Sequence, residues 1–338
     1  MLFKDVLSQL LERRDLTQEV MLDVMHQVMG GGLSHAQIAA FLIALRAKGE
    51  TVDEIAAAAM VMRELSTKVN IQDAAHLIDT CGTGGDGIQT FNVSTVCAFV
   101  AAAAGAKVAK HGGRSVSSTC GSADVLEALG VNVNLTPEKV ASLVNDIGIA
   151  FMFAPNFHPA MRYAAPVRKK LGVRTIFNVL GPLANPASAT HQVLGVYEAA
   201  LTETMAKVLS QLGSEHVMVV HGEDGMDEIS ISSPTQVSEL KNKAINTYSI
   251  KPTDFGLEMA DLKTIQVDNV DASKAMMLDV LKGAKGPHRD ITLLNAGAAI
   301  YVSGLTSTLK DGIEKAASVI DQGLSSKKLE ILKAASHG

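Results

Sequence analysis

The sequence is short of cysteine, of excess basic charge and of long hydrophobic runs. Its three cysteines, Cys81, Cys97 and Cys120, include no C-x-x-C pair, which disfavours a disulfide framework or a zinc knuckle and favours a reducing compartment. We therefore interpret them as small core residues. The formal net charge of −5 disfavours a protein that coats nucleic acid or an anionic membrane. Any phosphate that the chain binds must therefore be held by groups at the binding site itself, since the chain has no overall positive charge.

Membrane and export signals are also missing from the sequence. The longest apolar run, residues 96–106, is much shorter than the roughly 20 residues that span a bilayer. The N-terminal stretch MLFKDVLSQLLERRD alternates apolar and charged residues at helical spacing, which is not typical of a signal peptide. We expect a soluble cytoplasmic protein. Its 338 residues and 47% hydrophobic content are enough for one large domain or for two.

Residues 2 to about 67 have the pattern of short helices. Apolar residues recur there at three- and four-residue spacing, and the sequence offers no strand candidate. Ser34 with Gln37 and Thr51 with Glu54 fit the capping box, in which two side chains satisfy backbone donors of the first helical turn. The spacing predicts four helices that form a separate helical unit.

From about residue 76, short apolar runs alternate with helical stretches, which is the pattern of βαβ units around a mostly parallel sheet. The runs that we expect to be strands are HLIDTC, AKVAKH, VNVNL, IAFMFA, HQVLGVY and HVMVVHG. Thr136 and Pro137 fit the N-cap and first residue of a helix. About 35 residues between IAFMFAP and HQVLGVY look like two helices without a strand, and we expect them to join the N-terminal helices. The predicted fold class is α/β, with a small all-helical domain and a larger domain whose mostly parallel central sheet is flanked by helices.

The stretch DTCGTGGDGIQTFNVST, residues 79–95, places three glycines at the spacing G-x-G-x-x-G. A dinucleotide-binding turn needs a helix that begins within the glycines and an acidic residue about 20 positions later. Here the helix cannot begin comfortably before Asn92 or Ser94, and the next strand ends in Lys110 and His111. The stretch also lacks the Gly-Lys-Ser/Thr of a Walker A loop. Neither nucleotide motif therefore explains it.

Two loops in this region have the composition of an anion cradle. The first frees backbone N–H groups within residues 82–85 and follows them with hydroxyls at Ser94 and Thr95. The second, KHGGRSVSSTCGSAD at residues 110–124, sets cations beside two glycines and places hydroxyls before the next helix. Successive parallel strands end at one edge of a sheet, so both loops would face one crevice. The plainer alternative is that each loop is a glycine turn with a capping hydroxyl.

The third candidate element is GEDGMDEIS, in which Asp227 and Glu228 follow the expected strand HVMVVHG. Adjacent carboxylates in an extended segment point to opposite sides, so they would not share one proton. Each could instead reach a different Mg²⁺, an ion usually held by one or two carboxylates together with phosphate oxygens and water. A solvated turn is the alternative interpretation of this segment.

Taken in order, these motifs resemble those of the anthranilate phosphoribosyltransferase family. The similarity covers nearly the whole chain, through a helical N-terminus and then GTGGD, NVST, KHG-x-R, GSADVLEALG, FAPNFHPAMRYAAPVR, RTIFNVLGPLANP and GMDE. It implies a nucleoside phosphorylase-like fold. Residues 1–70 and inserted helices at about 158–186 would form the helical domain, and residues 74–157 and 187–338 the α/β domain.

The resemblance also implies an activity and partners. The reaction would be the Mg²⁺-dependent transfer of phosphoribose from phosphoribosyl pyrophosphate (PRPP) to the amine of anthranilate, in tryptophan biosynthesis. The family is usually a homodimer through the helical part. The resemblance implies small-molecule substrates, anthranilate and PRPP, and no nucleic acid or membrane partner.

Residues are carried over from the family by position. Those implied at PRPP are Gly82, Thr83, Gly84, Gly85, Asp86, Thr90, Asn92, Ser94, Thr95, Lys110 and Ser122. Those implied at anthranilate are Gly82, His111, Gly113, Ala154, His158, Arg168 and Gly181. The implied metal ligands are Ser94, Asp227 and Glu228. No acid or base is assigned, because positioning and electrostatics would carry the reaction.

Arg168 is the natural partner of the anthranilate carboxylate, because a guanidinium can bind a carboxylate with two hydrogen bonds. The alternative for VRKK is a solvated helix charge, and we expect that of Lys169 and Lys170.

The second loop departs from the family pattern. In the family it commonly reads K-H-G-N-R and continues S-S-K-S-G-S, whereas this chain has Gly113 in place of the Asn, and Thr119 and Cys120 in place of the Lys and Ser. The missing amide would contact the ribose or anthranilate, and the missing lysine would add charge near phosphate. Each loss could weaken binding by roughly 1 to 3 kcal/mol where nothing substitutes.

Two other functions fit parts of the pattern. A nucleoside phosphorylase of the same architecture would use phosphate in place of pyrophosphate, but HPAMR…VR and LGPL favour the anthranilate interpretation. A catalytically silent relative that binds nucleic acid would need a basic groove, against which the acidic net charge and the DE pair stand.

Overall fold

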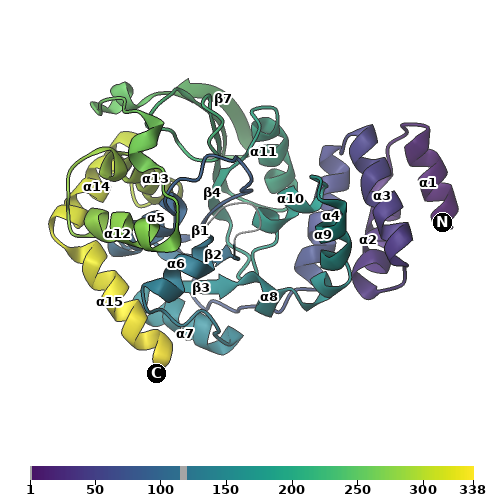
Figure 1. Ribbon diagram of the computed structural model, residues 1–338, viewed down its shortest axis with the longest axis horizontal. Coiled ribbons are helices and arrows are strands. Elements are labelled where there is room, and N and C mark those ends of the chain that lie inside the picture. The colour runs from purple at the N-terminus through teal and green to yellow at the C-terminus, as the bar shows by residue number, and fades with distance from the viewer. Residues whose placement is uncertain (1, 115–119) are drawn as a thin grey trace.

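One sheet forms the centre of the larger part of the molecule (Figure 1). The computed structural model describes residues 2–114 and 120–338. The strand order is β3-β2-β1-β4-β5-β6-β7, in which β1 to β5 are parallel and β6 and β7 are antiparallel. The strands are β1 (Leu77–Gly82), β2 (Lys107–Gly112), β3 (Ile149–Phe153), β4 (His191–Gly195), β5 (His216–Gly222), β6 (Thr235–Lys241) and β7 (Ala244–Ile250). The predicted mostly parallel sheet is confirmed.

The hairpin of β6 and β7 adds an antiparallel edge that the sequence pattern did not indicate. Asn242 and Lys243 join the two strands and have φ of 53° and 64°. A two-residue turn with both residues at positive φ matches the right-handed twist of its flanking strands. The hairpin therefore extends the sheet at the end remote from β3.

Four helices form the N-terminal part, as the spacing predicts: α1 (Phe3–Leu11), α2 (Gln18–Gly30), α3 (His35–Lys48) and α4 (Val52–Glu64). Both predicted capping boxes are present, at Ser34 with Gln37 and at Thr51 with Glu54. Helix α2 ends at Gly31, whose φ of 78° lies in the left-handed region that favours glycine. Local signals thus set these helix ends.

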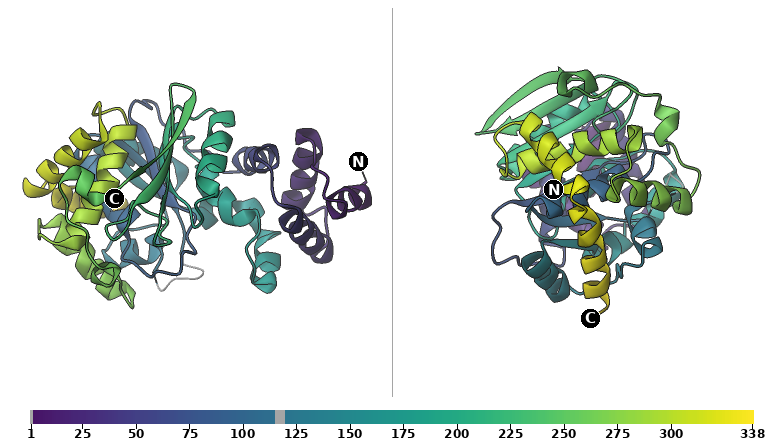
Figure 2. Two further views of the ribbon diagram at one scale, coloured as in Figure 1. Left: turned by 90° about the horizontal axis from the view of Figure 1, so that it is seen from above. Right: turned by 90° about the vertical axis from the view of Figure 1, so that its left-hand side faces the viewer.

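The segment between β3 and β4 leaves the sheet and packs on the N-terminal helices. It contains α8 (Ala154–Phe157), the 3-10 helix η1 (Pro159–Arg162), α9 (Ala165–Leu171), α10 (Phe177–Leu180) and the 3-10 helix η2 (Gly181–Leu183). Helix α9 contacts α3, η1 contacts α2, and α10 contacts α4. Val167 and Phe177 are buried in the same hydrophobic cluster as the N-terminal helices. Figure 2 shows these helices at one end of the molecule and the C-terminal helices at the other.

Helices cover both faces of the sheet. Along β5, Val217 and Val219 belong to the hydrophobic cluster of the N-terminal helices, whereas Met218 and Val220 belong to a second cluster, because successive strand residues face opposite sides. Helix α11 (Leu201–Gln211) packs on β5 and β6 in the first cluster.

The helices that contribute to the second cluster are α5 (Val93–Ala103), α6 (Ser122–Ala128), α7 (Pro137–Ile147), α12 (Val270–Leu281), α13 (Pro287–Val302), α14 (Leu309–Asp321) and α15 (Leu324–His337), with the 3-10 helices η3 (Pro252–Phe255) and η4 (Leu262–Ile265). Thr136 caps α7 and Pro137 is its first residue, as predicted. None of the described helices has the length and apolar character needed to cross a bilayer.

The prediction of a strand at VNVNL is wrong. In the described chain, residues 131–135 pair with no strand. The backbone N–H of Asn132 donates to Ser336 Oγ at 3.0 Å, and its side-chain Nδ2 donates to the Ser336 carbonyl at 3.2 Å. Val131 and Val133 are buried. The apolar alternation therefore reflects packing against α15, whose hydrogen bonds replace those of a sheet.

Candidate active site

The two glycine loops lie side by side at the carboxyl edge of the sheet. Strands β1 and β2 are parallel neighbours, so the loops that follow them leave the same edge. Thr95 Oγ1 donates to Ser122 Oγ at 3.1 Å, and Asn92 Nδ2 donates to the carbonyl of Cys120 at 3.2 Å. The structure thus brings the predicted cradle residues of both loops together.

The loop after β1 has a conformation that requires glycine. Gly84 and Gly85 have φ of 65° and 78°, in the left-handed region that side chains rarely adopt. The N–H of Gly84 donates to Asp227 Oδ2 at 2.7 Å. One of the predicted cradle amides is therefore bound to the acidic pair.

Asp227 approaches the strand ends so closely that side chains are excluded there. A Cβ added at Gly82 would overlap the Asp227 carboxylate, and one added at Gly195 would overlap the Asp227 main chain. Gly82 and Gly195 are partners across β1 and β4. Both glycines therefore make room for the acidic segment, and the sequence analysis missed Gly195.

Asp227 and Glu228 have different partners, as predicted, although the chain bends at these two residues and is not extended. Asp227 binds the glycine loop, whereas Glu228 Oε1 accepts a hydrogen bond from the N–H of Ser94 at 3.1 Å. Asn295 of α13 holds the next residue, because its Oδ1 accepts from the N–H of Ile229 at 2.8 Å and its Nδ2 donates to the Ile229 carbonyl at 2.9 Å. A buried helix thus anchors the acidic pair.

The acidic pair is desolvated, and its carboxylates repel each other and Asp86. Burial raises the pKa of Asp227, and the carboxylate of Asp86 raises it further. Burial also raises the pKa of Glu228, with a further contribution from Asp227. Within the described residues, no group of three or more His, Cys, Asp or Glu could hold a metal ion alone. The pair fits Mg²⁺, which takes its other ligands from phosphate and water.

Lys110 brings a buried positive charge to the same edge. It lies on β2 and is 3% exposed. Its Nζ donates to the carbonyl of Thr80 and to Ser94 Oγ, the latter at 3.2 Å. Because the N–H of Ser94 also donates to Glu228, Lys110 and the acidic pair meet at one residue.

Two buried histidines face each other beside the second loop. His158 Nε2 lies 3.2 Å from His111 Nε2, and the ring centroids are 4.9 Å apart. Burial lowers the pKa of His111 to about 3 and the pKa of His158 to about 4, so both imidazoles are neutral at pH 7. His111 also has a hydrogen bond with the backbone of Gly181. Three residues predicted at anthranilate therefore form one group.

Arg168 is a half-buried arginine with no acidic partner among the residues that the structure describes. Its guanidinium carbon lies 5.4 Å from the ring centroid of Phe177, and its side chain has no ion pair or hydrogen bond to another described residue. Burial lowers the pKa of Arg168. Lys169 and Lys170 on the same helix are exposed, as expected of solvated charges. A desolvated guanidinium needs an anion, so Arg168 fits the carboxylate of a ligand.

Three predicted residues contribute backbone contacts. Thr90 forms an isolated bridge with Gln266. The Ala154 carbonyl accepts a hydrogen bond from the N–H of His158 at 3.0 Å, and the Gly113 carbonyl accepts one from the N–H of Ala123 at 3.2 Å. Among the described residues, no atom lies within 4 Å of a Cβ built at Gly113.

Thr119 and Cys120 are two of the residues at which the second loop departs from the family pattern. Thr119 lies outside the described residues. Cys120 is buried, and its Sγ donates to Asn92 Oδ1 at 3.0 Å. Burial raises the pKa of the Cys120 thiol to about 11 and also raises the pKa of Cys81 and of Cys97. All three cysteines are therefore packed thiols.

Asp79 and Asn185 are buried polar residues that the sequence analysis did not assign. Asp79 Oδ1 accepts a hydrogen bond from the N–H of His111 at 3.1 Å, and its Oδ2 accepts one from Asn185 Nδ2 at 2.7 Å. Burial raises the pKa of Asp79. This pair supports the end of β2. A charged residue inside the apolar run HLIDTC was the signal for Asp79, whereas nothing in the sequence marks Asn185.

Known proteins resemble this chain over nearly its whole length. Residues 74–326 match the family described as "Glycosyl transferase family, a/b domain", and residues 4–66 match "Glycosyl transferase family, helical bundle domain". The anthranilate phosphoribosyltransferase of Methylobacillus flagellatus is 59% identical over 98% of each chain. That of Nitrosomonas europaea is 54% identical over 97% of this chain and 96% of its own.

Solved structures agree with these relatives. The crystal structure of anthranilate phosphoribosyltransferase from Thermus thermophilus has a TM-score of 0.93 and 41% identity, covering 99% of this chain and 100% of that one. The Saccharomyces cerevisiae enzyme in complex with PRPP and Mg has a TM-score of 0.89 and 30% identity, covering 99% of this chain and 98% of that one.

Proposed function

The chain belongs to the anthranilate phosphoribosyltransferase family, and we propose that it transfers the 5-phosphoribosyl group of PRPP to the amine of anthranilate. The products are N-(5-phosphoribosyl)anthranilate and pyrophosphate, in tryptophan biosynthesis. The observation that carries the proposal is the 2.7 Å hydrogen bond from Gly84 to Asp227. It joins a glycine loop suited to diphosphate to an acidic pair suited to a cation.

The first loop and its neighbours would hold PRPP. Backbone N–H groups of the glycine loop and of the first turn of α5 favour an anion there. Lys110 adds a buried positive charge. Ser94 and Thr95 place their hydroxyls in the first turn of α5. The contacts between Thr95 and Ser122 and between Asn92 and Cys120 support one shared site.

Asp227, Glu228 and Ser94 would hold Mg²⁺. Bound there, the ion would neutralise the charge of the departing pyrophosphate. The two carboxylates are oxygen donors in desolvated surroundings, and the Mg-bound S. cerevisiae relative supports the same metal.

Anthranilate would lie between the buried histidines and Arg168. The guanidinium of Arg168 would bind its carboxylate with two hydrogen bonds. His111 and His158 are neutral, so their rings can donate and accept hydrogen bonds without adding charge. Ala154 and Gly181 would leave room for the aromatic ring, since no described atom lies within 4 Å of a Cβ built at Gly181.

The chemistry needs orientation more than a base. The anthranilate amine is neutral near pH 7 and can attack C1 of the ribose directly. The C1–N bond forms as the C1–O bond to pyrophosphate breaks, and the amine then releases one proton. Lys110 and the loop N–H groups stabilise the negative charge that develops on the leaving group. Holding amine and sugar in orientation contributes up to roughly 7 to 11 kcal/mol.

The proposed domain division follows the sequence. Residues 1–70 with about 158–186 would form the helical domain, and residues 74–157 and 187–338 the α/β domain. The burial of Val167 and Phe177 among the N-terminal helices supports it. Closure of one domain onto the other would then gate the anthranilate site.

The chain would act as a homodimer through its helical part and would reside in the cytoplasm. Leu11 on α1 and Ile43 on α3 are 75% and 42% exposed, which supports an apolar contact face on these helices. The relatives described above are all named as transferases, so a nucleoside phosphorylase or a nucleic-acid-binding relative is not favoured.

Fluorescence of anthranilate tests the function directly. Purified protein with PRPP, anthranilate and Mg²⁺ should consume anthranilate, and the double variant Asp227→Ala with Glu228→Ala should lower kcat about a hundredfold and weaken the Mg²⁺ response. Glu223→Ala removes an exposed acid from the same segment and should change neither. No turnover by the wild type would reject the function, whereas an unchanged Mg²⁺ response of the double variant would reject the metal site.

A further inference from the structure

Arg174 lies in the short connection between α9 and α10 and reaches the glycine loop. Its Nη2 donates to the carbonyl of Gly85, and its guanidinium carbon lies 4.0 Å from the ring centroid of Tyr197. The residue is exposed, and it pairs with no carboxylate among the residues that the structure describes. Its guanidinium therefore joins the glycine loop to Tyr197.

Tyr197 follows β4 and is itself tied to the loop. Its N–H donates to Thr83 Oγ1 at 3.2 Å, and the N–H of Thr83 donates to the Gly195 carbonyl at 2.9 Å. The next residue, Gly84, is bound to Asp227. Three successive loop residues are thus held by three segments that are distant in the sequence, and Arg174 holds the last of them.

The bond from Arg174 fixes the direction of a peptide group. The peptide between Gly85 and Asp86 is planar, so its carbonyl and its N–H point in opposite directions. Holding the Gly85 carbonyl toward Arg174 sets the Asp86 N–H on the other side. Ordering glycine costs more conformational entropy than ordering any other residue, so the loop gains from an external tie.

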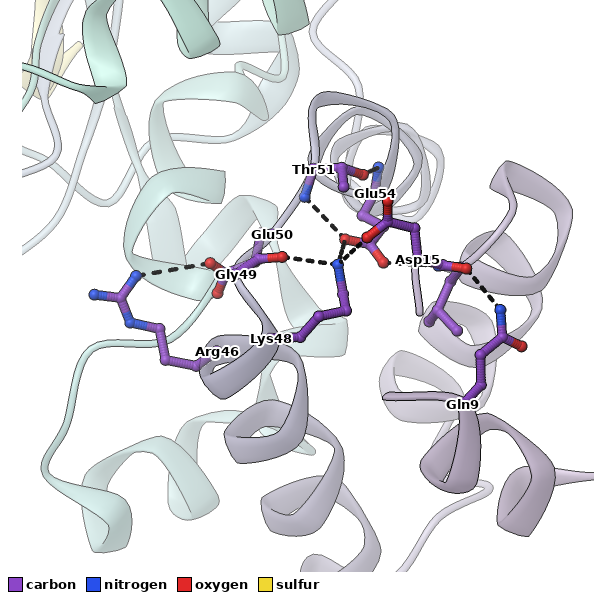
Figure 3. A network of polar contacts seen from close by, with 9 residues as sticks. Gln9, Asp15, Arg46, Lys48, Gly49, Glu50, Thr51 and Glu54 are labelled. Carbon is purple, nitrogen blue, oxygen red and sulfur yellow. Dashed lines mark hydrogen bonds and ion pairs between the residues drawn. The ribbon is translucent and has the colours of Figure 1, made fainter. Parts of the chain in front are cut away.

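The pair of Arg174 and Tyr197 also lies near the N-terminal helices. Burial raises the pKa of Tyr197, and the charges of Arg46 and Glu50 act on the same hydroxyl. Arg46 lies near the end of α3, and its Nη1 is 3.7 Å from Glu50 Oε2 (Figure 3). Tyr197 also packs against the hydrophobic cluster that contains these helices, so the pair links the helices to the glycine loop.

We propose that Arg174 is a positioning residue for PRPP: it stacks on Tyr197 and orders the glycine loop so that the loop N–H groups meet the diphosphate. The proposal rests on the proposed function. Lysine can supply the charge and a hydrogen bond, but it lacks the planar group that stacks on the tyrosine ring. The effect should therefore appear in PRPP binding and depend on the guanidinium.

Steady-state kinetics and calorimetric titration of PRPP with Mg²⁺ test the proposal. Arg174→Ala should raise the KM for PRPP and weaken its calorimetric Kd about tenfold, the effect of one lost charge-assisted hydrogen bond, with the KM for anthranilate changed less than about twofold. Tyr197→Ala should give the same phenotype, and Tyr197→Phe should not. Arg174→Lys should be intermediate. Lys170→Gln, which removes an exposed charge from α9 nearby, should match the wild type.

The outcomes separate this proposal from the proposed function. Turnover by the wild type with an unchanged KM and Kd for PRPP in Arg174→Ala would overturn the positioning role. Full recovery in Arg174→Lys, or a tenfold effect in Lys170→Gln, would show that charge alone matters and would also overturn it. If the two residues act as one unit, the double variant Arg174→Ala with Tyr197→Ala should be no worse than either single variant. Thermal unfolding checks that each variant is folded.

Discussion

At the residue scale, the space around each glycine decides what the site accepts. A Cβ at Gly82 or Gly195 would overlap Asp227, so these two positions cannot gain a side chain without moving the acidic pair. Gly113 is different. Among the described residues no atom lies within 4 Å of a Cβ built there, and its φ is not in the left-handed region. The departure from the family at Gly113 is therefore a missing group, not a steric requirement.

Replacing Gly113 by asparagine, the residue common in the family, should strengthen substrate binding. No described atom blocks the new amide, and the amide can add one hydrogen bond to the ribose or to anthranilate, which should lower the KM of that substrate about twofold to tenfold. Initial rates measured while each substrate is varied in turn would identify which one responds.

The matched control for that change is Gly113→Ala, which fills the same space without an amide and should lower neither KM. If the asparagine variant raised both KM values, or if alanine reproduced its effect, the amide would not be the missing contact.

At the element scale, the connection between α3 and α4 depends on one buried carboxylate (Figure 3). Glu54 is 0% exposed. Its Oε2 accepts hydrogen bonds from Lys48 Nζ and from the Thr51 N–H, each at 2.9 Å, and its Oε1 accepts one from the Leu16 N–H at 2.9 Å. Lys48 also pairs with Asp15 at 2.7 Å, but Asp15 is 67% exposed. Glu54 therefore joins the segment before α2, the end of α3 and the start of α4. The side chain of Asp15 contributes one exposed ion pair.

Glu54→Gln should destabilise the N-terminal helices far more than Asp15→Asn. The glutamine amide would turn an N–H toward the donors that now bind Glu54, and Lys48 would keep only the exposed Asp15 as a charged partner, which should lower the free energy of unfolding by about 2 to 3 kcal/mol. The exposed pair should contribute at most about 1 kcal/mol. Urea unfolding followed by circular dichroism compares the two variants directly, and equal losses would mean that burial of the carboxylate is not what matters.

Local signals explain why the helices were predictable and one strand was not. Capping boxes and glycine C-caps act within a few residues, so Ser34 and Thr51 mark helix starts that the structure confirms. The run VNVNL shows only that alternate residues are buried. Whether a sheet or a helix buries them depends on α15, about 200 residues later, where Ser336 binds Asn132. The alternation of apolar residues alone could not distinguish burial by a sheet from burial by a helix.

At the scale of the whole molecule, the site could be predicted only as far as it is built from motifs. The glycine loops with their hydroxyls and the acidic pair are each a short motif that can be recognised locally, and the structure brings these motifs to one edge. Asn185 and Arg174 reach the site through contacts that span 106 and 89 residues. Such contacts exist only once the sheet and the inserted helices have formed, so no local pattern indicates them.

The antiparallel edge of the sheet carries a polar cluster centred on Glu239. Glu239 on β6 accepts hydrogen bonds from His216 Nε2 at 2.8 Å, Tyr248 OH at 2.7 Å and Tyr301 OH at 2.8 Å. These donors come from β5, β7 and α13, so the carboxylate joins the antiparallel edge to the helix layer. Burial alone would raise the pKa of Glu239, but the three hydrogen bonds lower it to about 2.

Because the folded pKa of Glu239 lies below the unfolded value of about 4.3, its contribution to stability is complete above that value and disappears as the pH falls toward 2. Glu239→Gln should therefore be less stable than the wild type by about 1 to 2 kcal/mol at pH 7 after allowance for solvent screening, and the difference should narrow between pH 5 and pH 2. Free energies of unfolding in urea, measured across this range, give the curve. Glu203→Gln, which breaks an exposed pair with Lys207, should differ from the wild type by at most about 0.5 kcal/mol. A gap for Glu239→Gln that stayed constant down to pH 2 would mean that the carboxylate's charge does not support the fold.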